Sequence, residues 1–136
     1  MVARICLYLI VIVSGLALRR FGLNIGLPAA IVKYGGSILW GTMVYFLVAI
    51  TIPRIPRWSI AWFAAVIAIA VELFRLVQTP WLDTFRLTLA GALLFGRIFS
   101  WWNFLAYGAG MLLAFGLDAL AVKPESRATP TTHSPN

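Results

Sequence analysis

A run of 20 residues without a charged side chain, residues 34–53, most constrains how this chain can fold. As a helix, this run would extend about 30 Å, which is the thickness of the hydrocarbon core of a bilayer. Of all 136 residues, 62% are hydrophobic and 11% are charged, whereas about a quarter of the residues in a soluble domain are charged. We therefore expect an integral membrane protein with one membrane domain, residues 1–122.

Three further apolar stretches have the length or the flanking residues of a membrane-spanning helix. The first, residues 5–18, is short, but Arg4 and Arg19 on either side can extend to the membrane surface. The other two follow the proline-containing turn at residues 53–57 and precede the polar tail. These patterns predict an all-α fold, a polytopic helical bundle with four spans over residues 4–20, 34–53, 58–78 and 101–122.

A shorter apolar segment lies between the third and fourth expected spans. Its core between Arg86 and Arg97 would cover only about 15 Å as a helix, too little to cross a bilayer. We expect a short interfacial or re-entrant helix over residues 84–98, with Pro80 in the preceding turn and Asp83 as its N-cap. If both arginines extend to the membrane surfaces, the segment becomes a fifth crossing.

Both ends of the chain leave alternatives open. Residues 1–17 resemble a signal peptide, although we favour a retained helix because the rest of the chain is also strongly apolar. The tail, residues 123–136, is polar and proline-rich and is expected to be disordered. The net charge is +7, and the basic residues mostly flank apolar runs. This placement favours lipid head groups over nucleic acid as partners, but five basic residues on each side leave the orientation open.

Small residues recur on one face of the third expected span and lead to two charged side chains. Steps of three and four residues place them on one helical face, and such small-residue faces mark close helix contacts in membranes. Glu72 is therefore expected to point into the bundle, with Arg75 within reach of an ion pair. The fourth span has the same pattern of small residues, and this pattern leads to a carboxylate, that of Asp118. The small residues expected in helix packing are Ala64, Ala68, Gly91, Gly110 and Ala114.

The polar residues that follow these small-residue faces suggest a site near one membrane surface. An ionisable residue inside a span is a functional candidate because burying it is costly. The hypothesis is a polar ligand pocket formed by Glu72, Arg75, Gln78, Asp83, Arg86 and Asn103. The alternative is that Glu72 and Arg75 form a structural pair that holds helices in register.

The sequence offers little catalytic or metal-binding chemistry. His133 is the only histidine and lies in the tail, and Cys6 is the only cysteine. These two residues provide neither a metal site nor a disulfide, and no nucleophile or phosphate-loop motif is present. We expect no cofactor and no metal, we assign no catalytic residue, and we favour a protein that is not an enzyme.

One long segment, "ELFRLVQTPWLDTFRLTLAGALLFGRIFSWWNFLAYGAG", resembles a bacterial membrane family catalogued as domain of unknown function 2809. The resemblance covers about residues 4–120. Its core is E-L-x-x-x-x-Q-x-P-W-L-D-x-x-R, followed by G-x-x-x-x-G-x-x-F-S-W. The same order of residues is similar, more distantly, to VanZ-like membrane proteins, which are associated with teicoplanin resistance and cell-envelope lipids. The VanZ-like match carries over to Glu72, Gln78, Asp83, Arg86 and Gly91.

Two positions depart from the pattern of this family. Ser37 and Asn103 stand where the family usually has acids. Fewer carboxylates weaken the case for acid–base catalysis and favour a binding or structural role. The resemblance implies a multi-pass protein of the bacterial inner (cytoplasmic) membrane, in the cell envelope.

The favoured function is the binding of a lipid-linked or amphipathic ligand, such as a membrane lipid or a lipid-linked envelope precursor. Arg75 or Arg86 would hold an anionic head group, and Glu72 and Gln78 would orient these arginines. One alternative is a small transporter or proton-coupled subunit that uses Glu72. Another is an assembly or scaffold subunit whose small-residue faces bind a partner helix, in a homo-oligomer or with a partner membrane protein.

Overall fold

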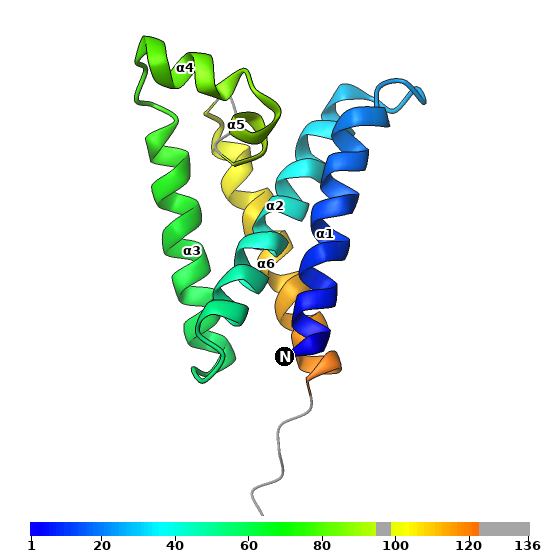
Figure 1. Ribbon diagram of the computed structural model, residues 1–136, viewed down its shortest axis with the longest axis vertical. Coiled ribbons are helices and arrows are strands. Elements are labelled where there is room, and N and C mark those ends of the chain that lie inside the picture. The colour runs from blue at the N-terminus through cyan, green and yellow to red at the C-terminus, as the bar shows by residue number, and fades with distance from the viewer. Residues whose placement is uncertain (95–98, 123–136) are drawn as a thin grey trace, which may run out of the picture.

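The computed structural model describes residues 1–94 and 99–122 of the chain, which form six α-helices and no β-strand (Figure 1). The helices are α1 (Val2–Phe21), α2 (Ala29–Thr51), α3 (Arg57–Phe74), α4 (Pro80–Arg86), α5 (Leu89–Leu94) and α6 (Trp101–Ala121). The expected tail, residues 123–136, lies outside the described residues, as do residues 95–98 of the expected short helix.

Four of these helices are long enough to cross a membrane. α1, α2, α3 and α6 contain 20, 23, 18 and 21 residues. At 1.5 Å per residue they extend from about 27 to about 35 Å, which brackets the hydrocarbon core of a bilayer. All four are also apolar enough to span it. The expected all-α fold with four spans is therefore confirmed for the described part of the chain.

The two ends of the bundle differ in what they contain. The N-terminus, the α2–α3 turn and the last turn of α6 lie at one end, which we call the N-terminal end (Figure 1). The α1–α2 loop and the short helices α4 and α5 lie at the other, which we call the α4 end. Residues near the start of α6 therefore lie level with residues near the ends of α1 and α3.

α2 forms the centre of the bundle and packs against α1, α3 and α6. Its residues 40–46 are all buried, as expected of a helix surrounded on every side. α1, by contrast, buries only Arg4, Val11 and Gly15 and packs mainly against α2. α1 is thus the most peripheral of the four spans.

Two glycines allow α2 and α6 to approach closely. A Cβ atom added to Gly110 would lie 2.1 Å from the carbonyl oxygen of Ile38, and one added to Gly41 would lie 2.7 Å from that of Tyr107. Thr42 Oγ1 then donates a hydrogen bond to the Gly110 carbonyl over 2.8 Å. A side chain larger than hydrogen at either glycine would push the two helices apart, as is typical of small-residue interfaces in membranes.

α3 turns its small residues toward the bundle, as its sequence pattern predicts. Ala64, Ala68 and Glu72 are buried, whereas Trp62 and Ile69 on the opposite face are exposed. The prediction that Glu72 points inward is therefore confirmed. The lipid-facing surface of α3 is made of large apolar side chains.

α3 ends at Phe74, four residues before the expected end of the third span. The buried guanidinium of Arg86 donates hydrogen bonds to the carbonyls of Phe74, over 2.9 Å, and Val77, over 3.0 Å. Continuing the helix would use the Phe74 carbonyl for a backbone hydrogen bond. The Phe74 carbonyl instead accepts hydrogen bonds from Val77 N, over 3.1 Å, and from Arg86 of the next helix, and the chain turns sharply into α4 (Figure 1).

Two short helices occupy the region where one was expected over residues 84–98. α4 begins with Pro80, which suits the first position of a helix because it lacks an N–H group. The predicted N-cap at Asp83 is wrong: Thr79 is the N-cap, and Asp83 lies in the first turn. α5 then begins after Thr88, whose Oγ1 accepts a hydrogen bond from Gly91 N over 3.1 Å, the geometry of a threonine N-cap.

Candidate functional site

A fully buried carboxylate, Glu72, lies at the α4 end among donors from α3 and α6. Its side chain is 0% exposed. Arg75 NH1 donates to Oε2 over 2.5 Å, and Tyr107 OH donates to the same oxygen over 2.9 Å. Asn103 Nδ2 and the backbone N–H of Ser100 each donate to Oε1 over 3.0 Å. We call these five residues the Glu72 cluster.

The geometry of the Glu72 cluster follows from its sequence positions. Arg75 is three residues after Glu72, where the helix ends and the side chain can turn back. Asn103 and Tyr107 are four residues apart on α6, so both face α3. Four donors satisfy both oxygens, and a carboxylate buried in this way is stable only with such partners. The cluster therefore joins α3 to α6.

Two contacts extend the cluster to α2. Ser37 Oγ donates to Asn103 Oδ1 over 3.3 Å. The ring of Tyr107 packs against that of Trp40, with centroids 4.8 Å apart, and the Arg75 guanidinium lies 5.8 Å from the centre of the Tyr107 ring. Glu72, Tyr107 and Trp40 thus form a continuous layer from α3 through α6 to α2.

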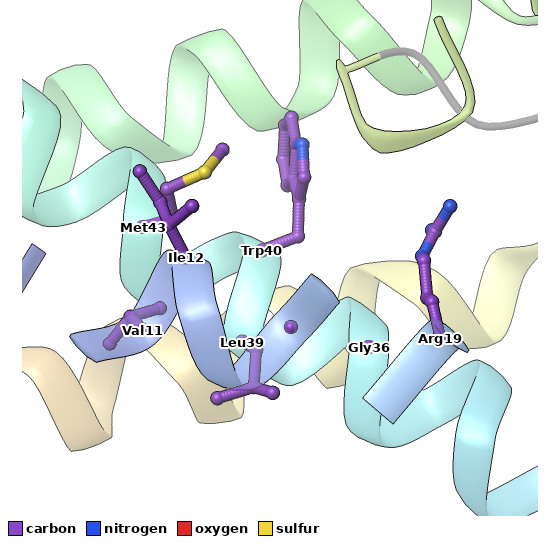
Figure 2. A pocket seen from close by; sticks show the side chains of 8 residues that line it. Val11, Ile12, Arg19, Gly36, Leu39, Trp40 and Met43 are labelled. Carbon is purple, nitrogen blue, oxygen red and sulfur yellow. The ribbon is translucent and has the colours of Figure 1, made fainter. Parts of the chain in front are cut away.

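A hollow between α1 and α2 lies beside this layer (Figure 2). Its apolar wall includes Val11, Leu39 and Met43, whereas Arg19 and Trp40 bring its polar groups. In Figure 2 the side chains of Arg19 and Trp40 point to the same side of the α1–α2 pair. The full set of residues that line the hollow is Val11, Ile12, Gly15, Arg19, Gly36, Leu39, Trp40 and Met43.

Trp40 contributes an unusual polar atom to the wall of the hollow. The residue is 7% exposed, and its Nε1 is buried without a hydrogen-bond partner. Buried N–H groups are nearly always paired, and an unpaired one costs about 1–3 kcal/mol. The indole N–H is therefore a donor that an acceptor entering the hollow could satisfy.

The structure brings together only part of the six-residue pocket predicted from the sequence. Glu72, Arg75 and Asn103 contact one another as described. Gln78 is exposed and lies between α3 and α4. Asp83, which is 52% exposed, pairs with Arg86 over 3.2 Å, and Arg86 also binds the end of α3. Asp83 and Arg86 thus form an ion pair apart from Glu72, and the bonds of Arg86 to the Phe74 and Val77 carbonyls stabilise the α3–α4 turn.

The five small residues expected in helix packing lie at close contacts. Ala64, Ala68 and Ala114 are at most 2% exposed, in the interior of the bundle. Gly110 meets the backbone of α2, and a Cβ atom added to Gly91 would lie 2.0 Å from the carbonyl oxygen of Phe85. Gly91 therefore permits the tight turn from α4 to α5 rather than a contact between spans.

A second buried carboxylate, Asp118, lies at the N-terminal end and was not predicted as a site. Arg4 Nε donates to Oδ1 over 2.7 Å and Arg4 NH2 donates to Oδ2 over 2.9 Å. Arg57 Nε and Tyr45 OH donate to Oδ2 over 3.3 and 3.4 Å. We call these four residues the Asp118 cluster. The only signal in the sequence was the small-residue face of α6 that ends at Asp118, because Arg4 and Arg57 resemble residues that flank a span.

The clusters offer binding and structural chemistry rather than an evident reaction centre. Both carboxylates are occupied by donors, and neither cluster contains a histidine or a cysteine. Within residues 1–94 and 99–122, no three histidine, cysteine or carboxylate side chains come together as a metal site would require. The open chemical feature is the hollow, with Arg19 and the unpaired Trp40 Nε1 beside the Glu72 cluster.

Comparison with known proteins finds one family, described as protein of unknown function (DUF2809), which matches residues 26–111. No curated protein and no solved structure matches the chain. The matched segment contains all of the Glu72 cluster and Trp40, whereas Arg4 and Asp118 of the second cluster lie outside it. Because the match covers more than half of the sequence, this membrane-spanning chain belongs to the DUF2809 family.

Proposed function

We propose that this protein binds an amphipathic ligand from the bilayer, without catalysing a reaction, at the α4 end of the bundle. The polar part of the ligand lies beside the Glu72 cluster, and its apolar part lies along the open side of the hollow between α1 and α2. The observation that carries the proposal is the juxtaposition of an apolar hollow with the polar groups of Arg19 and Trp40. Apolar walls with a few polar groups are typical of ligand sites.

The membrane in which we propose this activity is the cytoplasmic membrane of a bacterium. The resemblance to VanZ-like proteins is the reason to test cell-envelope lipids first. In this proposal, the Glu72 cluster acts indirectly: it fixes Tyr107, which packs against Trp40 in the wall of the hollow. The direct ligand contacts come from α1 and α2.

Native mass spectrometry of the protein purified in mild detergent tests this function. The variant Gly15→Leu fills the hollow from its α1 side, where a Cβ atom would lie 4.0 Å from Leu39 Cβ. The matched control is Gly108→Leu, because nothing lies within 4 Å of a Cβ atom added to this exposed glycine of α6. We expect a retained lipid on the wild type and on the control but not on folded Gly15→Leu. Equal lipid retention by all three proteins would contradict the proposal.

The buried carboxylate in α3 favours one second candidate, a transporter or proton-coupled subunit. In this candidate function, protonation of Glu72 breaks one of its hydrogen bonds to a donor. The measurement is transport into proteoliposomes, which should depend on pH and should be abolished in Glu72→Gln. The partner-helix alternative has less support, because Ala68 and Gly110, which it would use, are already covered within the bundle.

A further inference from the structure

The hollow between α1 and α2 changes in character along its length. Val11, Ile12 and Met43 give it an apolar wall toward the middle of the bundle, and Arg19 and Gly36 line it near the α4 end. Gly36 has no side chain, and a Cβ atom added to it would lie 3.7 Å from Arg19 Nε. The Arg19 guanidinium of α1 therefore lies directly against the backbone of α2 at this position. A charged group at the membrane surface followed by an apolar wall matches the two parts of a lipid.

The unpaired Trp40 Nε1 indicates what the head group must supply. An N–H group can only be satisfied by an acceptor, and this nitrogen is buried without one. Figure 2 shows the indole nitrogen on the side of the ring that faces Arg19. A ligand that carries several acceptor oxygens could therefore receive hydrogen bonds from both residues.

The charge at this end of the bundle favours an anion. Arg19 lies close enough to Arg75 for the two positive charges to repel each other, and Arg75 is paired with Glu72. Glu72 therefore neutralises the charge of Arg75, and Arg19 brings a second positive charge to this region. Arginine binds phosphate oxygens through charge-assisted hydrogen bonds, which are stronger than those between neutral groups.

The size of the hollow limits how the ligand lies. The volume of this partly open hollow is about 10 Å³, which is room for about one water-sized group. Only a head-group oxygen fits inside, so the chains of the ligand must lie along the open side between α1 and α2.

We propose that the ligand is a lipid with an anionic phosphate head group, bound by the Arg19 guanidinium and Trp40 Nε1. This inference rests on the proposed function and adds the class of ligand and its direct contacts. Tyr107 is a positioning residue, because it holds the Trp40 ring while its own hydroxyl is fixed by Glu72.

Lipid add-back to the delipidated protein tests this inference. Phosphatidylglycerol, which is anionic, and phosphatidylcholine, which is zwitterionic, are offered separately, and bound lipid is measured by native mass spectrometry. Arg19→Gln removes the charge. Trp40→Phe removes the N–H group together with one of the two fused rings, and it keeps a six-membered ring to pack against Tyr107. The matched controls are Arg20→Gln, the neighbouring exposed cation, and Trp62→Phe, an exposed tryptophan on α3.

We expect the wild type to bind phosphatidylglycerol about tenfold more tightly than phosphatidylcholine, and each test variant to lose about tenfold, the effect of one charge-assisted hydrogen bond. The controls should bind as the wild type does. Equal binding of both lipids, or equal loss in Arg20→Gln, would indicate surrounding lipid or general surface charge and would overturn the inference. Displacement of the lipid by inorganic phosphate alone would overturn it in favour of a free-anion site.

The result also separates this inference from the function on which it rests. If lipid binding is lost in Gly15→Leu but unchanged in Arg19→Gln and Trp40→Phe, the hollow binds a ligand by other contacts and only the inference fails. If the wild type retains no lipid of either class, the proposed function fails as well. Thermal unfolding of each variant confirms that the proteins compared are folded.

Discussion

The two buried carboxylates lie at opposite ends of the bundle, and each needs hydrogen-bond donors to compensate its burial. The donors differ between the two ends. Asp118 is bound by Arg4 and Arg57, which come from α1 and α3, and by Tyr45 from α2. Glu72 is bound by an arginine from its own helix and otherwise by neutral donors. The Asp118 cluster joins all four spans, whereas the Glu72 cluster joins mainly two of them.

This difference indicates which of the two clusters is the better candidate for a functional site. Two guanidinium groups occupy Asp118, and with Tyr45 OH they bind both of its oxygens. Around Glu72, the ionic bond is local, and the neighbouring layer of Tyr107 and Trp40 ends in an unpaired donor. We therefore regard the Asp118 cluster as structural and the Glu72 cluster as the support of a binding site.

The largest effect is expected from Asp118→Asn. This change leaves Arg4 and Arg57 without a counter-charge, and breaking a buried ion pair costs about 3–5 kcal/mol. The measurement is the free energy of unfolding in mixed detergent micelles. A loss below about 1 kcal/mol would contradict the structural role of the cluster.

Glu72→Gln should lower the free energy of unfolding less, by about 2–3 kcal/mol. Only one guanidinium, that of Arg75, loses its partner, and its position after the end of α3 lets it turn toward the membrane surface. The same unfolding measurement tests the ranking. If Glu72→Gln costs more than Asp118→Asn, the contrast drawn between the clusters is reversed.

The two tyrosine hydroxyls refine the comparison. Tyr107→Phe removes a 2.9 Å hydrogen bond to a carboxylate and should cost about 1.5–3 kcal/mol. Tyr45→Phe removes a 3.4 Å contact to a carboxylate that two arginines already bind, and should cost about 0.5 kcal/mol. Equal losses for the two variants would argue that both hydroxyls are equally needed.

The smallest effect is expected for Asp83→Asn. Its carboxylate is 52% exposed in its pair with Arg86, and exposed ion pairs contribute at most about 1 kcal/mol, which solvent screening lowers further. We expect unfolding to be unchanged within about 0.5 kcal/mol. A larger loss in the same assay would give Asp83 a role that its geometry does not suggest.

The sequence was sufficient to predict the four spans and the inward face of α3. Charge-free runs determine which segments enter a membrane, and the alanines before Glu72 determine which side faces the bundle. The end of α3 at Phe74 was not predicted, because there the Phe74 carbonyl accepts hydrogen bonds from Val77 N in a tighter turn and from Arg86 of another helix. A contact of this kind leaves no periodic pattern in the sequence.

The candidate site was predictable only where its members are polar residues near the ends of spans. Glu72, Arg75 and Asn103 were grouped correctly by their positions at one end of the bundle, but Asp83 and Arg86 were grouped with them although they form a separate pair. Arginines that flank apolar runs, such as Arg4 and Arg19, look alike whether they contact lipid head groups or the protein interior. Only the packing of the spans in the structure shows whether such an arginine contacts lipid head groups or the protein interior.

The pairing of Arg4 with Asp118 joins residues that are 114 positions apart in the chain. A ribosome that adds about 5–20 residues per second needs roughly 6–23 s to make the intervening segment. During that interval the first helix has been synthesised, yet its buried arginine has no counter-charge. The ion pair of Arg4 therefore forms only after the last helix is made, and a nascent chain that stops short of α6 carries a charge in α1 without its carboxylate partner, which the cell's quality control can recognise.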